Sequence, residues 1–275
     1  MAGTLYVVAT PLGNLGDLSP RAAETLKRVA VVVAEDTRHS KPLLHHAGSN
    51  ADLVSFHAHS SERALGRIVR ILTEGRDVAL ITDAGTPAIS DPGVELVAAA
   101  RERGIQVVTI PGPTAVAASL AVSGLSGDRY VFLGFLPRKG SDRRRFLLTA
   151  AQSEWTVVLF EAPNRVTQLL ADLLEVCGPE RRVAVSRELT KVFEETRAGT
   201  LQELSEHYAE APVRGEVTVV LSGTSKPHVE DPPPDPTERA KALLADGLSR
   251  KDVANRLVEE TGISRNAAYR LVNEL

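Results

Sequence analysis

The chain has 275 residues, of which 43% are hydrophobic and 24% are charged, as in ordinary soluble globular proteins of about two domains. The formal net charge of −3 excludes strong overall basicity, although a local basic patch is still compatible with it. The single cysteine, Cys177, excludes an intramolecular disulfide and a cysteine-ligated metal cluster. No apolar run reaches the roughly 18 residues of a membrane span and no signal-peptide pattern is present, so we expect a cytoplasmic protein without membrane contact.

The first part of the chain alternates short apolar runs, which predict strands, with amphipathic segments, which predict helices. Ser19 and Pro20 have the residue types preferred at the N-cap and the first position of a helix, and Gly104 is suited to a helix end. This alternation predicts a parallel, doubly wound sheet. The expected strands are 4–9, 29–34, a run from 78 and 106–110, and the expected helices are 20–28, 60–75 and 94–103.

The loops that follow these strands are rich in Gly, Pro and Asp, above all residues 82–93. Ligands of open α/β sheets bind beyond the carboxyl ends of the strands, so a ligand loop is expected here, with an ordinary strand-to-helix connection as the alternative. The dinucleotide fingerprint G-x-G-x-x-G is absent. Glu35 and Asp36 could serve substrate binding or base catalysis, or Asp36 or Thr37 could simply cap the next helix.

The composition changes after residues 124–127, and the following segment again mixes strands and helices, with some antiparallel pairing expected. Its expected strands are 130–134, 155–160, 182–186, 193–197 and 216–221. Ser141 is expected to cap a helix that starts at Asp142. Residues 127–150 carry six Lys or Arg against two Asp, which indicates either a solvated helix face or a nucleic-acid patch.

Five prolines between residues 225 and 236 predict a semi-rigid linker. Beyond it, three helices are expected at 237–245, 250–261 and 265–275, with Ser249 and Ser264 as caps and helix-turn-helix spacing between the last two. We therefore assign 1–112 to a parallel α/β domain, 113–224 to a mixed α/β domain, 225–236 to the linker and 237–275 to a helical tail.

Six motifs in one order resemble the tetrapyrrole-methylase-like (class III) methyltransferases over about residues 4–223. They are TPLGNLGD at 10–17, AEDTR at 34–38, TDAGTPAISDPG at 82–93, PGPTA at 111–115, EAPNR at 161–165 and RELTK at 187–191. Asn164 and Thr114 depart from the His and Ser that members often carry, but both keep a polar side chain.

The resemblance implies two α/β domains of the tetrapyrrole methylase type with S-adenosylmethionine in the inter-domain cleft, and a homodimer. Its ribosomal RNA branch implies methylation of the ribose 2′-hydroxyl of a cytidine in the decoding region of 16S ribosomal RNA in the small subunit, without a metal. A small-molecule tetrapyrrole or corrin methylase is the alternative, and it would leave the basic loop and the tail unexplained. A DNA-binding regulator would leave the ligand loops unexplained.

Three groups of site residues follow from the loops and the resemblance. Cofactor contacts are expected from Pro11, Leu12, Gly13, Asn14, Asp83, Ala84, Gly85, Thr86, Pro87, Gly112, Thr114 and Ala115. Glu35, Glu161 and Glu188 are the candidate catalytic bases, although Glu188 could equally form an ion pair with Arg187 or Lys191. RNA phosphates are expected at Arg38, Arg138, Lys139, Arg143, Arg144, Arg145, Arg165, Arg187 and Lys191.

Overall fold

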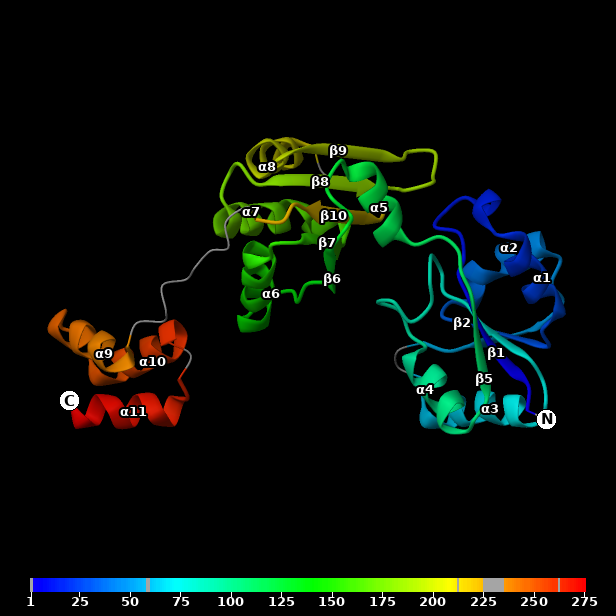
Figure 1. Ribbon diagram of the computed structural model, residues 1–275, viewed down its shortest axis with the longest axis horizontal. Coiled ribbons are helices and arrows are strands. Elements are labelled where there is room, and N and C mark those ends of the chain that lie inside the picture. The colour runs from blue at the N-terminus through cyan, green and yellow to red at the C-terminus, as the bar shows by residue number, and fades with distance from the viewer. Residues whose placement is uncertain (1, 58–59, 212, 225–234, 262) are drawn as a thin grey trace. The chain divides into compact units, whose positions relative to one another are not determined.

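The computed structural model describes residues 2–57, 60–211, 213–224, 235–261 and 263–275 (Figure 1). Its internal contacts divide the chain into two compact units, Met1–Thr224 and Ser225–Leu275. The first unit contains two five-stranded sheets with their helices, and the second contains helices only. No helix among the described residues is long and apolar enough to cross a membrane.

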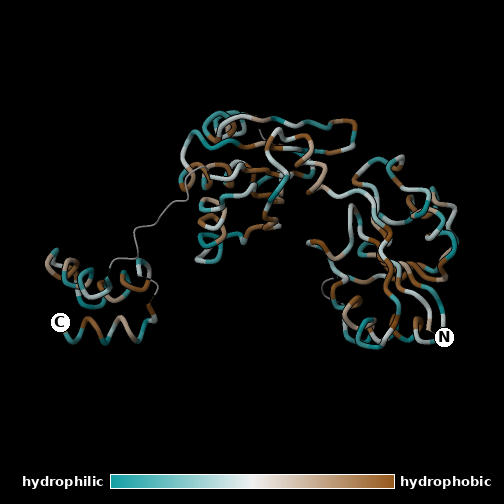
Figure 2. The backbone as a smooth tube through the Cα atoms, in the orientation of Figure 1, coloured by the Kyte–Doolittle hydropathy of each residue, from teal (hydrophilic) through white to brown (hydrophobic). Residues whose placement is uncertain are grey.

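The first sheet is parallel throughout, with the strand order β3-β2-β4-β1-β5, which confirms the predicted parallel α/β arrangement. The central strands are apolar over their whole length because both faces of the sheet are covered. Hydrophobic residues follow the strands of this sheet in Figure 2. The strands are β1 Thr4–Val8, β2 Val31–Ala34, β3 Asp52–Ser55, β4 Val78–Leu80 and β5 Gln106–Ile110.

Two separate hydrophobic clusters cover the two faces of this sheet, since neighbouring strand residues point to opposite sides. Val31 and Val33 pack in the cluster with Ile68 and Leu72, whereas Val32 packs in the other cluster. The helices are α1 Pro20–Arg28, α2 Thr37–Ala47, α3 Glu62–Thr73 and α4 Val94–Glu102, and a short 3-10 turn, η1, spans Leu15–Asp17. Ser19 caps α1 as predicted, by accepting a hydrogen bond from the backbone N–H of Ala22.

The second sheet is mixed, with the order β6-β7-β10-β8-β9. Only β6 and β7 are parallel, and β10 runs antiparallel to both β7 and β8, so the expected antiparallel pairing is confirmed. The prediction of a strand at 193–197 was early by two residues, because Phe193 lies in an exposed loop and the edge strand itself is polar. The strands are β6 Tyr130–Phe135, β7 Thr156–Glu161, β8 Arg182–Arg187, β9 Glu195–Thr200 and β10 Val217–Leu221.

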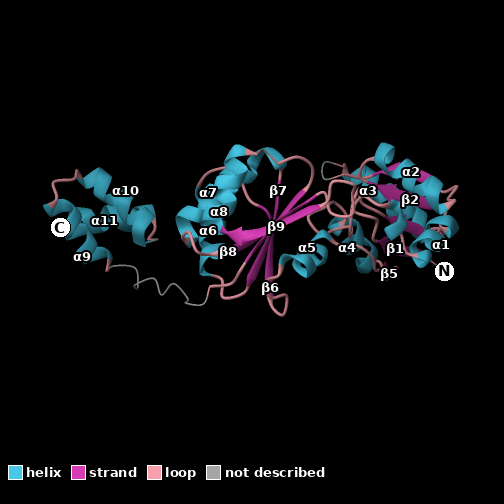
Figure 3. Ribbon diagram, turned by 90° about the horizontal axis from the view of Figure 1, so that it is seen from above, coloured by secondary structure: helices cyan, strands magenta, loops and turns pink. Residues whose placement is uncertain are grey.

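Helix α5 (Ala115–Ser123) packs on the second sheet, with Val116 and Leu120 against Val158, Ala184 and Val220. The change of sheet in the chain therefore occurs before α5, earlier than the change in composition at 124–127. Three other helices cover the opposite face, as Figure 3 shows, and a second 3-10 turn, η2 (Pro163–Arg165), precedes one of them. They are α6 Ser141–Gln152, α7 Val166–Cys177 and α8 Leu201–Glu210.

One predicted cap was wrong. Ser141 is the first residue of α6 and forms no cap hydrogen bond, whereas Gly140 occupies the N-cap position with a φ of 89°. A glycine adopts this left-handed conformation without steric cost, so the loop enters the helix one residue earlier than a Ser cap would require.

The second unit packs three helices around its own small core, which contains Leu243, Val253, Leu257 and Val272. The predicted cap Ser264 accepts a hydrogen bond from the backbone N–H of Ala267. The predicted linker at 225–236 extends too far, because Pro236 is already the first residue of a helix. Residues 225–234 lie outside the described residues. So does Gly262, which was predicted to break the helix. The helices are α9 Pro236–Ala245, α10 Arg250–Thr261 and α11 Arg265–Glu274.

One of the predicted RNA-binding residues, Arg143, is buried at the contact between α6 and α7. Its Nε and Nη2 donate to Oδ2 of Asp172 at 2.8 and 2.5 Å, and Nη1 donates to the Pro137 carbonyl at 3.1 Å. Its neighbour Arg144 is exposed. A phosphate contact through Arg143 would require breaking this buried pair, so the residue belongs to the packing of the domain.

We predict that Arg143→Ala lowers the free energy of unfolding by about 3–5 kcal/mol, because it leaves the carboxylate of Asp172 without its charged partner. Arg144→Ala, the matched control on the exposed side of the same helix, should change it by less than about 0.5 kcal/mol. Urea denaturation of both variants measures the difference. Equal stability of the two variants would contradict the structural role of Arg143.

Candidate active site

A cavity of about 470 Å³ lies within the first unit, at the carboxyl ends of β1, β2 and β4 and beside the second sheet. Its wall contains loops of the first sheet together with the ends of β6, β7 and β10. The lining residues are Leu12, Glu35, Thr82, Asp83, Ala84, Gly85, Thr86, Ile89, Ser90, Asp91, Thr114, Ala115, Phe135, Phe160, Glu161, Ala162, Pro163, Leu189, Gly215, Glu216, Val217 and Thr218.

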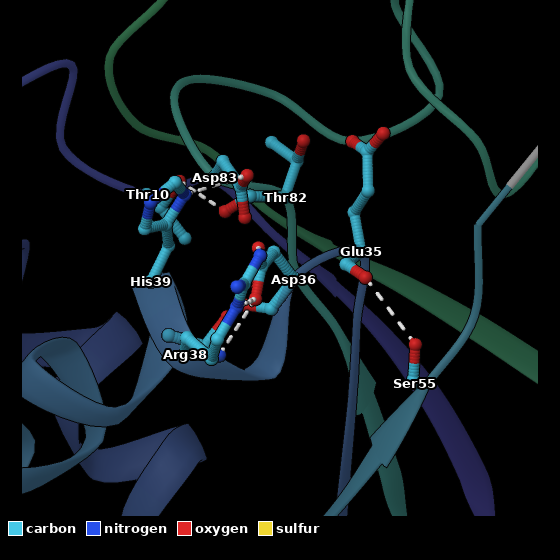
Figure 4. A network of polar contacts seen from close by, with 9 residues as sticks. Thr10, Glu35, Asp36, Arg38, His39, Ser55, Thr82 and Asp83 are labelled. Carbon is cyan, nitrogen blue, oxygen red and sulfur yellow. Dashed lines mark hydrogen bonds and ion pairs between the residues drawn. The ribbon is translucent and has the colours of Figure 1, made fainter.

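Backbone hydrogen bonds between Thr10 and Gly85 hold two of the predicted ligand loops together. The N–H of Thr10 donates to the Gly85 carbonyl at 2.8 Å, and the N–H of Gly85 donates back at 3.1 Å. The buried hydroxyl of Thr10 also donates to the Thr82 carbonyl at 3.1 Å (Figure 4). Gly85 has a φ of 85°, a conformation that side chains disfavour, and an added Cβ would lie 3.3 Å from a methyl of Leu12.

The remainder of the 82–93 loop holds strained backbone. Ala88 and Ser90 adopt φ values of 67° and 61°, and a non-glycine residue in this region costs roughly 1–2 kcal/mol. Such strain persists where the surrounding structure holds it in place, and it concentrates at ligand-binding loops. Because the same loop lines the cavity, its geometry supports the sequence interpretation of 82–93 as a ligand loop.

Three carboxylates, Glu35, Asp83 and Asp91, line the cavity from the ends of β2 and β4 and from the loop. Burial, followed by the nearby charges of Asp91 and Asp83, raises the pKa of Glu35 above its ordinary value. Burial also raises the pKa of Asp91. The Nδ1 atom of His39 lies 3.2 Å from Oδ2 of Asp83 (Figure 4). This wall of the cavity is therefore suited to a positively charged ligand.

The two interpretations of the Glu35-Asp36 pair apply to different residues. Asp36 is the N-cap of α2 and accepts a hydrogen bond from the backbone N–H of Arg38 at 2.8 Å. Hydrogen bonds from Arg38 hold the pKa of Asp36 well below its usual range. Glu35, in contrast, faces the cavity and is available for ligand binding or proton transfer.

The second sheet contributes Glu161, whose side chain is completely buried at the cavity wall. Its Oε1 accepts a hydrogen bond from the Ala162 N–H at 2.9 Å and lies 3.2 Å from Nε of Arg165. Its Oε2 has no hydrogen-bond partner among the described residues. A buried carboxylate oxygen without a partner is costly, so Oε2 is a candidate acceptor for a donor from a ligand.

The structure brings together part of the predicted cofactor set. Leu12, Asp83, Ala84, Gly85, Thr86, Thr114 and Ala115 line the cavity, whereas Pro11, Gly13, Asn14, Pro87 and Gly112 do not. Asn14 instead caps the η1 turn by accepting a hydrogen bond from Gly16. At Gly112 an added Cβ would lie 3.0 Å from the Cβ of Ala9, so this glycine allows two chain segments to approach closely.

Sequence reasoning missed the lining segment 215–218. That segment opens β10, and the register pairs Val217 with both Glu161 and Arg187, which end the antiparallel strands β7 and β8. The amino end of β10 therefore lies where its neighbours end. A search for strand ends alone could not find it without knowing the direction of β10.

Glu188 does not line the cavity. Its Oε1 accepts from Nζ of Lys191 at 2.9 Å and from the backbone N–H of Glu216 at 3.1 Å, and the hydrogen bond from Lys191 lowers its pKa. Its backbone has a φ of 52°. These contacts connect the β8–β9 loop to the start of β10, which is the ion-pair alternative that the sequence left open.

The predicted RNA-binding residues differ in how available their charges are. Arg138, Lys139 and Arg144 are exposed and have no ion pair in the described part of the chain. Arg38 and Arg145 are exposed, but each forms an ion pair, Arg38 with Asp36 and Arg145 with Asp142. Three further cations are half-buried in ion pairs. Arg165 pairs with Glu161, Arg187 pairs with Glu195, and Lys191 pairs with both Glu188 and Glu216. Within the described ranges no cluster of three or more His, Cys, Asp or Glu could hold a metal ion.

The raised pKa of Glu35 has a consequence for stability. The pKa of Glu35 is higher in the folded protein than in the unfolded chain, so the folded protein binds the proton more tightly. The free energy of unfolding therefore falls as the pH rises from the unfolded pKa through the folded pKa. We predict that Glu35→Gln raises the melting temperature at pH 7, and that the gain disappears near pH 4, about the unfolded pKa of glutamate. Scanning calorimetry at both pH values, with the exposed Glu24→Gln as control, tests this. A gain that is the same at both pH values would show that charge is not the cause.

Comparisons with known proteins show which family the chain belongs to. The model of the tetrapyrrole (corrin/porphyrin) methylase family matches residues 4–205. A Synechocystis protein named ribosomal RNA small subunit methyltransferase I is 44% identical over 99% of this chain and 98% of its own length. The Pseudomonas aeruginosa protein of the same name is 44% identical over 98% of this chain and 96% of its own length.

Solved structures share the fold of the first unit. Uroporphyrin-III C-methyltransferase of Thermus thermophilus, complexed with S-adenosyl homocysteine, aligns with a TM-score of 0.59 over 80% of this chain and 97% of its own length. At 20% identity this similarity concerns the fold. The family model matches most of the chain, and the two relatives align over nearly all of it. The chain therefore belongs to the tetrapyrrole methylase family and is a methyltransferase.

Proposed function

We propose that the chain methylates small-subunit ribosomal RNA, at the ribose 2′-hydroxyl of a cytidine in the decoding region of 16S ribosomal RNA. The observation that carries the proposal is the extent of the similarity to the two ribosomal RNA small subunit methyltransferases I. Their alignments span 99% and 98% of this chain, whereas the family model ends at residue 205. The helical tail is thus a feature shared with relatives named for ribosomal RNA.

The methyl donor is S-adenosylmethionine, and the residues of the cavity fit it. This molecule carries a sulfonium and an ammonium group, and Asp83, Glu35 and Asp91 provide negative charge at one wall. Asp83 would hold the ammonium group or the ribose hydroxyls, with the close-approaching backbone of Gly85 and Thr86 beside it. When bound, the cofactor supplies an activated methyl group, so the protein mainly has to align the acceptor oxygen.

A ribose hydroxyl is a weak nucleophile, and the chain offers a proton acceptor for it. Oε2 of Glu161 is buried, unpartnered among the described residues and at the cavity wall, while Oε1 is held by Ala162 and Arg165. We assign Oε2 as the atom that accepts the hydrogen bond and then the proton of the hydroxyl. Glu35 is the alternative base, whereas the carboxylate of Glu188 is already occupied by Lys191.

Each of the two units carries a group of cations that would contact the RNA. The first is the exposed set Arg138, Lys139 and Arg144 that follows β6. The second is on the tail: α11 buries Ala268 and Val272, and its exposed residues are Arg265, Asn266, Tyr269, Arg270, Asn273 and Glu274. These side chains suit phosphates, base edges and stacking.

The proposed partner is the small ribosomal subunit, and the proposed enzyme is a cytoplasmic homodimer. Val192 and Phe193 support a protein contact, because these residues are 93% and 71% exposed in the β8–β9 loop. Large exposed hydrophobic side chains on adjacent positions are typical of association surfaces.

In the decisive experiment, the protein and labelled S-adenosylmethionine are incubated in parallel reactions with small subunits, free ribosomal RNA, DNA or uroporphyrinogen III. We expect label in the small-subunit RNA, at a position where the adjacent phosphodiester resists alkaline cleavage, because a methylated 2′-oxygen can no longer attack it. Label in uroporphyrinogen alone would instead support the tetrapyrrole or corrin alternative. Label on a base would retain the RNA substrate but refute the ribose assignment.

The tail should contribute to substrate binding and leave cofactor binding unchanged. We predict that R265A/R270A in the full chain weakens small-subunit binding and lowers the slope of log affinity against log salt by about one for each phosphate that the variant no longer neutralises. The control K241A/R256A removes one cation of α9, which pairs with Glu238, and one cation of α10, which pairs with Glu260. Equal salt slopes for the two double variants would show that α11 does not contact the RNA.

A further inference from the structure

Strand β6 contains an irregularity next to the cavity. Phe132 pairs with Val158, but the next paired residues are Gly134 with Leu159 and Phe135 with Phe160, so Leu133 is an extra residue in the strand. Gly134 has a φ of 63°, the left-handed conformation that glycine adopts at β-bulges. Such a bulge shifts every later side chain of the strand to the opposite face of the sheet.

The shift decides where Phe135 points. Without the bulge, Phe135 would share a face with Leu133, which packs against the main core of the second sheet. With it, Phe132 and Phe135 both lie on the side of Phe160, with ring centroids 4.8 and 5.5 Å from that ring. The bulge therefore takes one large aromatic ring out of the core and places it at the cavity wall.

Gly134 also allows this end of β6 to approach the ligand loop. It is buried, and a Cβ added to it would lie 3.0 Å from Oγ of Ser90, in the strained part of residues 82–93. Phe135 is 56% exposed although it lines the cavity, and Ile89 of the facing loop is 47% exposed. Exposed apolar side chains on two walls of one cavity indicate a flat, apolar ligand group.

We propose that Phe135 is the platform on which the base of the nucleotide to be methylated stacks. This inference rests on the proposed function, because it concerns how an RNA substrate is held. The continuation of the chain favours RNA over the cofactor: β6 ends at Phe135, and the exposed cations Arg138 and Lys139 follow within four residues. A base on Phe135 would thus have its flanking phosphates near these cations, while the carboxylates at the other wall serve the cofactor.

The test uses full-length protein, with steady-state kinetics on small subunits and calorimetry with S-adenosylmethionine. Phe135→Ala should raise the KM for small subunits about ten- to a hundredfold, the usual effect of losing one base-stacking ring. Affinity for S-adenosylmethionine should stay unchanged. Phe135→Trp should restore KM, and Phe135→Leu should not, because leucine is apolar but has no aromatic face. The control Tyr130→Ala removes the ring of a 45% exposed residue at the other end of the same strand.

Three results would overturn the inference. The first is a loss of S-adenosylmethionine affinity in Phe135→Ala, which would place the ring against the cofactor. The second is full activity of Phe135→Leu, which would show that an apolar side chain is sufficient and that no base stacks on the ring. The third is a KM for Phe135→Ala equal to that of Tyr130→Ala. Failure of the proposed function is distinguishable, because then the unmodified protein itself would transfer no methyl group to small subunits.

Discussion

The candidate site depends on the pair of backbone hydrogen bonds between Thr10 and Gly85. These bonds join the loops that follow β1 and β4, strands that are neighbours in the sheet but far apart in the chain. Backbone bonds do not depend on side-chain rotamers, so they fix the relative position of the two loops more firmly than side-chain contacts would. The carboxylate of Asp83 and the strained residues Ala88 and Ser90 occupy defined positions only because the loop is held at this point.

The second constraint is the direction of β10. Because β10 runs against β7 and β8, its first residues lie beside Glu161 and Arg187, and the contact of Glu188 with Lys191 and Glu216 fixes the connection between these segments. The second sheet therefore presents two strand ends and one strand start at the cavity. This arrangement explains why Glu188, the second residue of the RELTK motif, has a structural contact and does not line the cavity, whereas Leu189 does.

Periodicity and turn chemistry predicted the first sheet closely, since its strands are short apolar runs followed by Gly- and Pro-rich loops. They also predicted Glu35 and residues 83–86 at the cavity, because the carboxyl ends of parallel strands share one edge. Periodicity and turn chemistry could not predict three features. The bulge that turns Phe135 to the cavity depends on pairing with β7, the segment 215–218 depends on strand direction, and the burial of Arg143 depends on Asp172, 29 residues further along the chain. Each is a long-range contact, and a local pattern contains no information about its partner.

The cavity wall carries negative charge, whereas the surface near it carries positive charge. A cavity with Glu35, Asp83 and Asp91 at one wall repels phosphate, whereas the exposed cations at 138–144 attract it. Under the proposed function, an RNA strand would be drawn to the outer surface, and only an uncharged part of a nucleotide, its base or its ribose, would enter next to the carboxylates. Burial, together with the nearby charges of Asp91 and Asp83, raises the pKa of Glu35. Under the proposed function, a cationic cofactor relieves the repulsion among these carboxylates. The same residues would then bind the methyl donor, keep the RNA backbone outside and admit the hydroxyl that is to be methylated.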